Sequence, residues 1–425
     1  MIGKIAWKNT WFKPLNTTLS IILLTASVAI ITVLILLQKQ FEEQFNKNMN
    51  NVDLVLGAKG SPLQLVLSAV YQIDAPPGNI SYQQAQQWIN HPFVETAIPL
   101  AYGDNYMGYK IVGTTADYIS KFEGKLSSGQ FNTNDFEVVI GATIASKLDL
   151  KIGAKFHGSH GDAEGEVHEE HDYTVVGVLE PTGQLIDNVI VTSVASVWHM
   201  HDHEHHHHEE VPTETVDTIT DNTHHHEDDH EHSHDHEHHV EDDKELTAVL
   251  LKLKNNMAKI TWQRMIPQNT DMQAASPILE INRLFSLFGV GLQAMQYLAY
   301  GIMAISGISI FVALYNTLKE RKYEFALLRI HGASKTQMLS MILIESLFLC
   351  FVGYIFGMIL GRVGLYFISI SSQEEFKINF NPFEFVWDKE LLLLFVTIMV
   401  GCLAALLPAW KAYSLNISKT LAHAE

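Results

Sequence analysis

Apolar residues are concentrated in four runs, each long enough to cross a lipid bilayer as a helix. The first run, residues 19–37, contains no charged side chain, and about 20 apolar residues in a helix span a hydrocarbon core of about 30 Å. It continues into charged sequence with no small-residue cleavage site, so it predicts an uncleaved anchor rather than a signal peptide. Three further spans are expected at 286–318, 338–370 and 391–407. The pattern predicts one span, a large loop and then three spans.

The distribution of Lys and Arg orients these spans. Three lysines precede the first span, and five Lys or Arg residues crowd the loop 319–337. By the positive-inside rule both segments face the cytoplasm, which places residues 38–285 outside it. The remaining segments are a cytoplasmic amphipathic helix along the membrane surface at 1–18, a short external loop at 371–390 and a cytoplasmic tail at 408–425.

The large loop between the first two spans has the texture of a folded domain. Short apolar runs alternate with Gly and Pro, which is typical of an α+β arrangement. Strands are expected at 137–140, 173–179, 188–191 and 248–253, and a helix at 81–90. The expected fold class is therefore a membrane protein with four transmembrane α-helices and an α+β extracytoplasmic domain between helices 1 and 2.

A tract between Trp198 and Lys244 interleaves 16 histidines with 16 Asp and Glu residues. Strand sequence resumes after it, so residues 199–243 are expected to form a disordered insertion in the domain. Neutral imidazole is the commonest protein ligand for Zn(II), Cu(II) and Ni(II), and carboxylates complete the shell of such ions. The tract therefore predicts binding of a divalent transition metal, Zn(II) foremost. The candidate ligands are His199, His201, His203, His205, His206, His207, His208, His224, His225, His226, His230, His232, His234, His236, His238 and His239.

Two alternatives about histidine stay open from the sequence. A run with so few apolar residues cannot bury a core, so a solvated loop insertion without a role in metal chemistry also accounts for the tract. A smaller cluster, His157, His160, His168 and His171, precedes the strand at 173–179. It is either the tip of a hairpin or a second contributor to the same metal-binding region.

Composition excludes several classes of protein. The net charge of -19 comes largely from the histidine tract, and no basic face is left to neutralise phosphates, which argues against nucleic acid as a partner. Cys350 and Cys402 lie inside apolar runs and predict no disulfide. The chain contains no Gly-x-x-x-x-Gly-Lys-[Ser/Thr] phosphate loop and no hydrolase motif, so we expect a membrane subunit without enzymatic activity of its own.

The loop after the second span carries the most specific motif. Residues 320–334 read ERKYEFALLRIHGAS, which resembles the E-R-x-x-E-[apolar]-x-x-L-R-[apolar]-x-G-A-S pattern of FtsX/MacB-like ABC transporter permeases. Residues 408–412, PAWKA, resemble the end of that family. Residues 124–156 resemble its strand-rich periplasmic core domain, and 53–62 resemble one subgroup. The resemblance covers most of the chain except the histidine tract.

This resemblance implies a homodimeric permease in the bacterial inner membrane, with two cytoplasmic ABC ATPase subunits that alone handle ATP. It also gives the charged loop a role in contacting the ATPase, for which Glu324 and Arg329 are the best candidates. Positive-inside charge alone would explain the basic residues of the loop but not its acidic ones. The full set of candidate contacts is Glu320, Arg321, Lys322, Glu324 and Arg329.

The third span contains residues suited to helix packing. Gly353, Gly357 and Gly361 recur every four residues on one helical face and allow two backbones to approach closely. Glu345 lies about two turns into this span, where an ionisable side chain usually faces protein or water. We expect it to hold two helices together, the alternative being a relay for substrate or protons.

The predicted function is a permease subunit that passes the force of ATP hydrolysis in a partner chain to the extracytoplasmic domain, in the transport or handling of zinc. Alternatives are a lipoprotein, drug or peptide exporter, a non-transporting regulator of a cell-wall hydrolase, and a passive metal-buffering membrane protein. Expected partners besides the ATPase are membrane lipid and a periplasmic metal-binding or adaptor protein.

Overall fold

The computed structural model describes residues 14–160, 171–207, 244–375 and 380–414. Residues 1–13 of the expected amphipathic helix at 1–18 lie outside the described residues. By contacts between residues the chain divides into two units. One unit comprises residues 1–43 and 284–425, called here the helical unit, and the other comprises residues 44–283, called here the outer domain.

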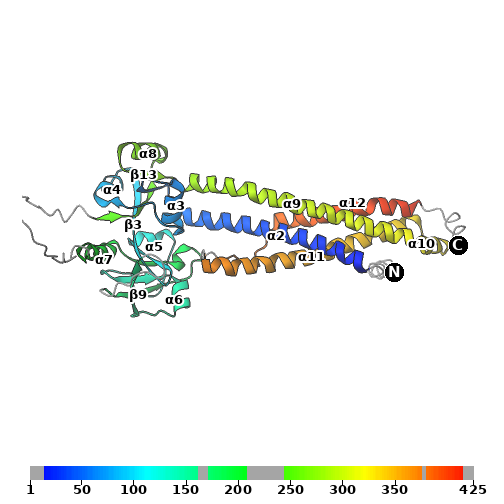
Figure 1. Ribbon diagram of the computed structural model, residues 1–425, viewed down its shortest axis with the longest axis horizontal. Coiled ribbons are helices and arrows are strands. Elements are labelled where there is room, and N and C mark those ends of the chain that lie inside the picture. The colour runs from blue at the N-terminus through cyan, green and yellow to red at the C-terminus, as the bar shows by residue number, and fades with distance from the viewer. Residues whose placement is uncertain (1–13, 161–170, 208–243, 376–379, 415–425) are drawn as a thin grey trace, which may run out of the picture. The chain divides into compact units, whose positions relative to one another are not determined.

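The helical unit consists of long helices (Figure 1). Apolar side chains fill its interior. Its helices are α2 (Pro14–Met49), α9 (Pro277–Glu320), α10 (Lys322–Ile330), α11 (Lys335–Glu375) and α12 (Trp387–Tyr413), of which α2 and α9 also contribute residues to the outer domain. Within the described residues four helices, all but α10, are long and apolar enough to cross a membrane. The predicted four-span architecture is confirmed. Each helix extends beyond its predicted span, because polar turns at the ends continue the same hydrogen-bonding pattern.

The outer domain is built on one mixed sheet of eleven strands, in the order β13-β1-β12-β3-β4-β10-β6-β9-β5, with β7 beside β9 and β8 beside β3. A separate pair joins β11 to β2. The strands are β1 (Leu54–Ala58), β2 (Ile80–Ser81), β3 (Val94–Tyr106), β4 (Tyr109–Thr114), β5 (Leu126–Gly129), β6 (Glu137–Ile140), β7 (Lys155–Phe156), β8 (Ser159–His160), β9 (Tyr173–Leu179), β10 (Ile190–Ser193), β11 (Glu245–Leu246), β12 (Ala248–Leu253) and β13 (Met272–Ala275).

Most neighbouring strands are antiparallel, while β10 runs parallel to β4 and β6 runs parallel to β9. Strand β3 joins the two parts of the sheet, pairing with β12 over its first half and with β4 over its second. Strand β12 follows the histidine tract and lies between β1 and β3, and β10 precedes the tract in the same sheet. The chain on both sides of the tract therefore belongs to one folded domain.

Short helices cover the sheet and complete two apolar cores. They are α3 (Pro62–Tyr71), α4 (Tyr82–Ile89), α5 (Ala116–Lys121), α6 (Ala142–Leu148), the 3-10 turn η1 (Leu185–Asn188), α7 (Val194–His207) and α8 (Asn256–Asn269). One core contains Leu54, Val249 and Trp262, and the other contains Ile111, Val138 and Tyr173. Burial of this apolar surface is the main force that holds the domain together.

Two sequence expectations differ from the structure. The strand predicted at 188–191 begins only at Ile190, because the carboxylate of Asp187 accepts backbone N–H groups of Thr182 and Gly183 and holds the preceding residues in a turn. The prediction that the histidine tract is disordered from residue 199 is wrong for its first part, since α7 continues to His207. Val197 and Met200 are buried, so packing of the helix start supports the turns that follow.

Candidate functional site

The charged loop after the second span folds into α10, a helix of nine residues with well-defined ends. At its C-terminus, Gly332 adopts a left-handed conformation (φ 96°), and the N–H groups of Gly332 and Ala333 donate to the carbonyls of Arg329 and Leu328. This Schellman arrangement closes the helix and favours glycine at that position. The left-handed conformation of residue 332 explains why the Gly-Ala-Ser segment of the motif begins with glycine.

The next helix, α11, begins with a capping box. The N–H of Gln337 donates to Oγ of Ser334, and the N–H of Ser334 donates to Oε1 of Gln337. Reciprocal bonds of this kind satisfy two backbone donors at a helix start. Four residues, 331–334, therefore separate α10 from α11, and the closed end of one helix and the capped start of the other leave little freedom between them.

The five predicted ATPase contacts are not equivalent in the structure. Arg321 donates to Glu324 from both Nε and Nη2, the first at 2.7 Å, so these two charges are paired within the chain. Glu320 and Lys322 are exposed at the ends of α9 and α10. The Nη1 atom of Arg329 is buried and has no hydrogen-bond partner among the described residues.

The outward face of α10 is apolar, which the motif did not indicate. Tyr323, Leu327 and Ile330 are 51%, 43% and 57% exposed. Their spacing of four and three residues places them on one face of the helix, whereas Phe325 and Ala326 are buried in the helical unit. We call Tyr323, Leu327 and Ile330 the α10 stripe. Hydrophobic periodicity within residues 322–330 is the signal that could have identified it.

The glycines of the third span lie against the first span. A methyl group placed on Gly357 would come within 3.0 Å of the carbonyl oxygen of Thr25, and one on Gly361 within 2.9 Å of that of Ala29. Gly353 likewise faces the side chain of Leu24. Such short distances mean that α2 and α11 pack backbone to backbone, an arrangement that only glycine permits.

Glu345 is 6% exposed in the interior of the helical unit. The neighbouring Ser346 donates to the carbonyl of Gly401 at 2.7 Å and so joins α11 to α12. Ser346, next to Glu345, therefore makes one of the polar contacts between α11 and α12.

An ion pair that sequence reasoning did not identify lies between α11 and α12. Nη2 of Arg362 donates to both carboxylate oxygens of Glu390, at 2.8 and 3.0 Å, and Glu390 is 1% exposed. The same guanidinium donates to the carbonyl of Glu384 and lies 4.8 Å from the ring centroid of Phe385. An arginine inside an apolar run together with an acid in the first turn of the next helix is the sequence signal for this pair.

The predicted metal ligands fall mostly outside the described residues. His208 and the nine histidines after it are in the segment 208–243, and His168 is in 161–170. His201, His203, His205, His206 and His207 belong to α7, where their backbone is helical. Within the described part of the chain, no three His, Cys, Asp or Glu side chains form a group that could hold a metal ion.

Phe136 lies near both histidine clusters. The ring of His171 stacks on Phe136 with centroids 4.6 Å apart, and the ring of His199 lies 6.4 Å from Phe136. His199 has a carboxylate oxygen of Asp135 within 3.7 Å, and His157 has one of Asp172 within 3.3 Å. His171 of the smaller cluster and His199, the first histidine of the tract, therefore lie beside the same ring.

A second group of contacts in the outer domain involves the last turn of α2. The ammonium of Lys121, at the end of α5, donates to the carbonyl of Asn48 at 2.7 Å and lies 3.9 Å from the ring centroid of Phe122. The hydroxyl of Tyr71 donates to the carbonyl of Phe45 at 3.0 Å. Lysine at a helix C-terminus satisfies a free carbonyl and opposes the negative end of the helix dipole. These contacts fix the end of α2 in the outer domain.

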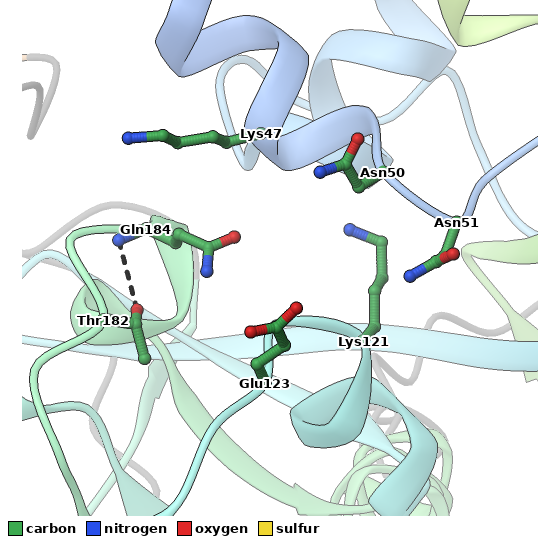
Figure 2. A pocket seen from close by; sticks show the side chains of 7 residues that line it. All are labelled: Lys47, Asn50, Asn51, Lys121, Glu123, Thr182 and Gln184. Atoms are coloured by element: carbon green, nitrogen blue, oxygen red, sulfur yellow. Dashed lines mark hydrogen bonds between the residues drawn. The ribbon is translucent and has the colours of Figure 1, made fainter.

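A polar cavity of about 240 Å³ opens beside this helix end. Figure 2 shows Lys47, Asn50 and Asn51 on one side, facing Glu123, Thr182 and Gln184 across the opening, with Lys121 between them. Lys121 is only 9% exposed, and this burial lowers the pKa of its ammonium to about 7. A buried lysine without a carboxylate partner is held partly neutral near neutral pH.

The shifted pKa of Lys121 predicts how stability depends on pH. The ordinary lysine pKa is 10.5, so between about pH 7 and that value the unfolded chain binds more protons than the folded one, and the free energy of unfolding rises with pH. Lys47 and Glu123 are the other charged groups around the cavity. From pH 7 to pH 9.5 we expect the outer domain to gain about 3 kcal/mol relative to a Lys121→Met variant. Thermal unfolding of both proteins at several pH values measures this difference, and identical pH profiles would contradict it.

Comparison with known proteins places this architecture in a family. Residues 15–222 match the MacB-like periplasmic core domain, and residues 297–417 match the FtsX-like permease C-terminal domain. An uncharacterised ABC transporter permease of Methanocaldococcus jannaschii is 22% identical over 182 residues, covering 43% of this chain and 44% of the relative. The chain thus aligns with less than half of the length of this relative.

Two solved structures align with just over half of the chain. The periplasmic region of MacB from Actinobacillus actinomycetemcomitans aligns with 56% of this chain and 97% of its own, at 8% identity and a TM-score of 0.33. The extracellular domain of the noncanonic ABC-type transporter YknZ from Gram-positive bacteria aligns with 52% and 99%, at 11% identity and a TM-score of 0.29.

The two family domains cover different parts of the chain. The first begins in α2 and covers the strands β1 to β10 of the outer domain but not β11, β12 and β13, and the second covers the second half of α9 and the helices α10, α11 and α12. The protein is a multi-pass inner-membrane protein with a large domain on the periplasmic side. The chain therefore belongs to the family of FtsX/MacB-like ABC transporter permeases.

Proposed function

We propose that this chain is the permease subunit of a mechanotransmitting ABC transporter, working as a homodimer with two cytoplasmic ATPase subunits. Membership of an ABC permease family implies a cytoplasmic ATPase partner. The observation that carries the proposal is α10, a short helix with closed ends and an exposed apolar stripe between the second and third spans. An apolar helix face of this kind fits a groove on a partner protein.

The proposed mechanism uses the stiffness of packed helices. Nucleotide binding moves the ATPase subunits, and the α10 stripe transfers this movement into the helical unit. The short connection from α10 to the capped start of α11 limits the movement lost in the loop. Because α2 and α9 each contribute residues to both units, displacement of these helices alters the outer domain without a need for substrate to pass through the bilayer.

Spectroscopic distances test this mechanism. Spin labels on exposed positions of the outer domain, in full-length protein reconstituted with its ATPase, should change their distance across the homodimer when a non-hydrolysable ATP analogue binds. Labels on an α10 stripe variant that no longer binds the ATPase provide the control. Equal distances with and without nucleotide, in a complex shown to be intact, would refute mechanotransmission.

We further propose that the transporter captures or hands over a divalent transition metal, with Zn(II) as the leading candidate. The density of imidazole and carboxylate groups in residues 199–243 supports this assignment. One histidine of each cluster, His171 and His199, lies beside the ring of Phe136, which supports a joint role for the two clusters. Binding should weaken near pH 6, because metal ligands must lose their protons.

A substitution of all 16 tract histidines by asparagine tests the metal proposal while keeping chain length and acidic charge. We expect calorimetry of the full-length protein to give more than one Zn(II) per chain, and this binding to collapse in the substituted protein. A matched variant with the 16 tract carboxylates changed to amides should keep most of the binding. Unchanged zinc binding and unchanged metal-dependent growth in the histidine variant would sink the proposal. Growth defects with antibiotics instead would favour export of drugs or peptides, and capture of a cell-wall hydrolase would favour a regulatory role.

A further inference from the structure

The polar cavity beside the end of α2 is lined by side chains that have no role in the proposed force transmission. The side chains around it carry ammonium, carboxylate, amide or hydroxyl groups, and none is aliphatic or aromatic: Lys47, Asn50, Asn51, Lys121, Glu123, Thr182 and Gln184. Pockets for apolar ligands are lined mainly by hydrophobic residues. The volume of about 240 Å³ is also below the roughly 300–1,000 Å³ of pockets that enclose drug-sized molecules. The cavity therefore suits a small polar molecule rather than a lipid chain or a drug.

The charges on the cavity wall are not matched with one another. Within the described part of the chain, the carboxylate of Glu123 has no hydrogen-bond or ion-pair partner, although it shares the cavity with two lysines. The ammonium of Lys121 uses the carbonyl of Asn48 as an acceptor and still has further N–H groups to donate. A molecule with an anionic group and a cationic group would satisfy both sides.

Glu123 also stands at a backbone position that favours a different residue. It follows α5 in a left-handed conformation with φ of 54°, and the N–H groups of Glu123 and Gly124 donate to the carbonyls of Ser120 and Ile119. This is the helix-closing position that glycine occupies most easily. A glutamate is not required there by the backbone, which indicates that its carboxylate has another use. Figure 2 places that carboxylate at the cavity.

We propose that this cavity binds a small zwitterion, such as an amino acid, a dipeptide or the phosphoethanolamine head of a phospholipid. Lys121 and Lys47 bind its anionic group, Glu123 binds its ammonium, and the amides of the asparagines and Gln184 bind the atoms between. The ligand thereby contacts the same ammonium that holds the carbonyl of Asn48 at the end of α2. Occupancy of the site is consequently linked to how firmly that helix end is held.

Calorimetry on the full-length protein in nanodiscs tests the proposal, with glycylglycine and phosphoethanolamine as separate probes and acetate as an anion without a cationic group. Glu123→Gly removes the carboxylate and relieves the left-handed strain, so this variant should unfold at the same or a higher temperature. We expect it to bind either zwitterion at least about tenfold more weakly. Lys121→Met should show the same loss and should also lose binding of acetate.

Lys110→Met is the matched control for the lysine. The ammonium of Lys110 also donates to one carbonyl, that of Asp74, and lies 5.7 Å from an aromatic ring, but it is not part of the cavity. This variant should bind both zwitterions within about twofold of the unmodified protein. Stronger binding of glycylglycine identifies a peptide ligand, and stronger binding of phosphoethanolamine identifies a lipid head group. Failure of both probes to bind, or binding that Glu123→Gly leaves unchanged, overturns the proposal even if transport depends on α10 as proposed above.

Discussion

Replacing Leu327 by aspartate should abolish coupling between this permease and its ATPase while leaving the permease folded. Leu327 is the central residue of the α10 stripe, and its side chain is 43% exposed rather than packed in the helical unit. A carboxylate there would be desolvated in an apolar groove of the ATPase, a change that typically costs 2 kcal/mol or more at the centre of an interface, or roughly a thirtyfold loss of affinity. Copurification and ATPase activity of the reconstituted complex measure the loss.

Thr336→Asp supplies the matched control for this prediction. Thr336 is exposed in the first turn of α11, so the variant adds the same charge to the same cytoplasmic loop, where a helix N-terminus favours an acidic side chain. We expect this complex to keep its ATPase activity. If Leu327→Asp copurifies with the ATPase as well as Thr336→Asp does, the α10 stripe is not the docking surface. Glu324→Gln distinguishes docking through the apolar α10 stripe from docking through charged residues, because Glu324 is already paired with Arg321 inside the chain.

The course of the chain could be predicted largely from its apolar pattern. Strands at 173–179 and 248–253 were expected and are observed as β9 and β12 with the same bounds. β9 alternates buried and partly buried residues, β12 is almost entirely buried, and turn residues bound both strands, so local sequence determines both their type and their ends. Four uncharged or nearly uncharged runs likewise predicted the four long helices, because a bilayer requires a minimum helix length.

The candidate sites were less predictable because they depend on contacts between distant residues. The motif drew attention to charges, but the fold pairs Arg321 with Glu324 and leaves the apolar α10 stripe outward. Lys121 gave no sequence signal, since its burial arises from packing against Phe122 and the end of α2. Such tertiary contacts leave no local periodicity in the chain.

Removing the guanidinium of Arg362 should have the largest effect on the stability of the helical unit. Arg362→Met would leave the carboxylate of Glu390, which is 1% exposed, without its bidentate partner. Loss of one partner from a buried ion pair typically costs about 3–5 kcal/mol, because the remaining charge stays desolvated. We expect the unfolding temperature of the purified protein to fall by on the order of 10 °C. The matched control is Lys39→Met, which breaks the more exposed ion pair with Glu384 and should change the unfolding temperature far less.

The double variant Arg362→Met with Glu390→Met shows whether the loss of stability comes from leaving Glu390 as an unpaired buried charge or from losing the other contacts of Arg362. Replacing both ions of a buried pair by apolar side chains is often neutral or stabilising, so most of the lost stability should return. The guanidinium also donates to the carbonyl of Glu384 and packs on Phe385, and the double variant does not restore those contacts. A double variant as unstable as Arg362→Met alone would show that these other contacts of Arg362, rather than the charge of Glu390, account for the loss. The stability of the connection between α11 and α12 would then depend on the loop that precedes α12 and not on the ion pair.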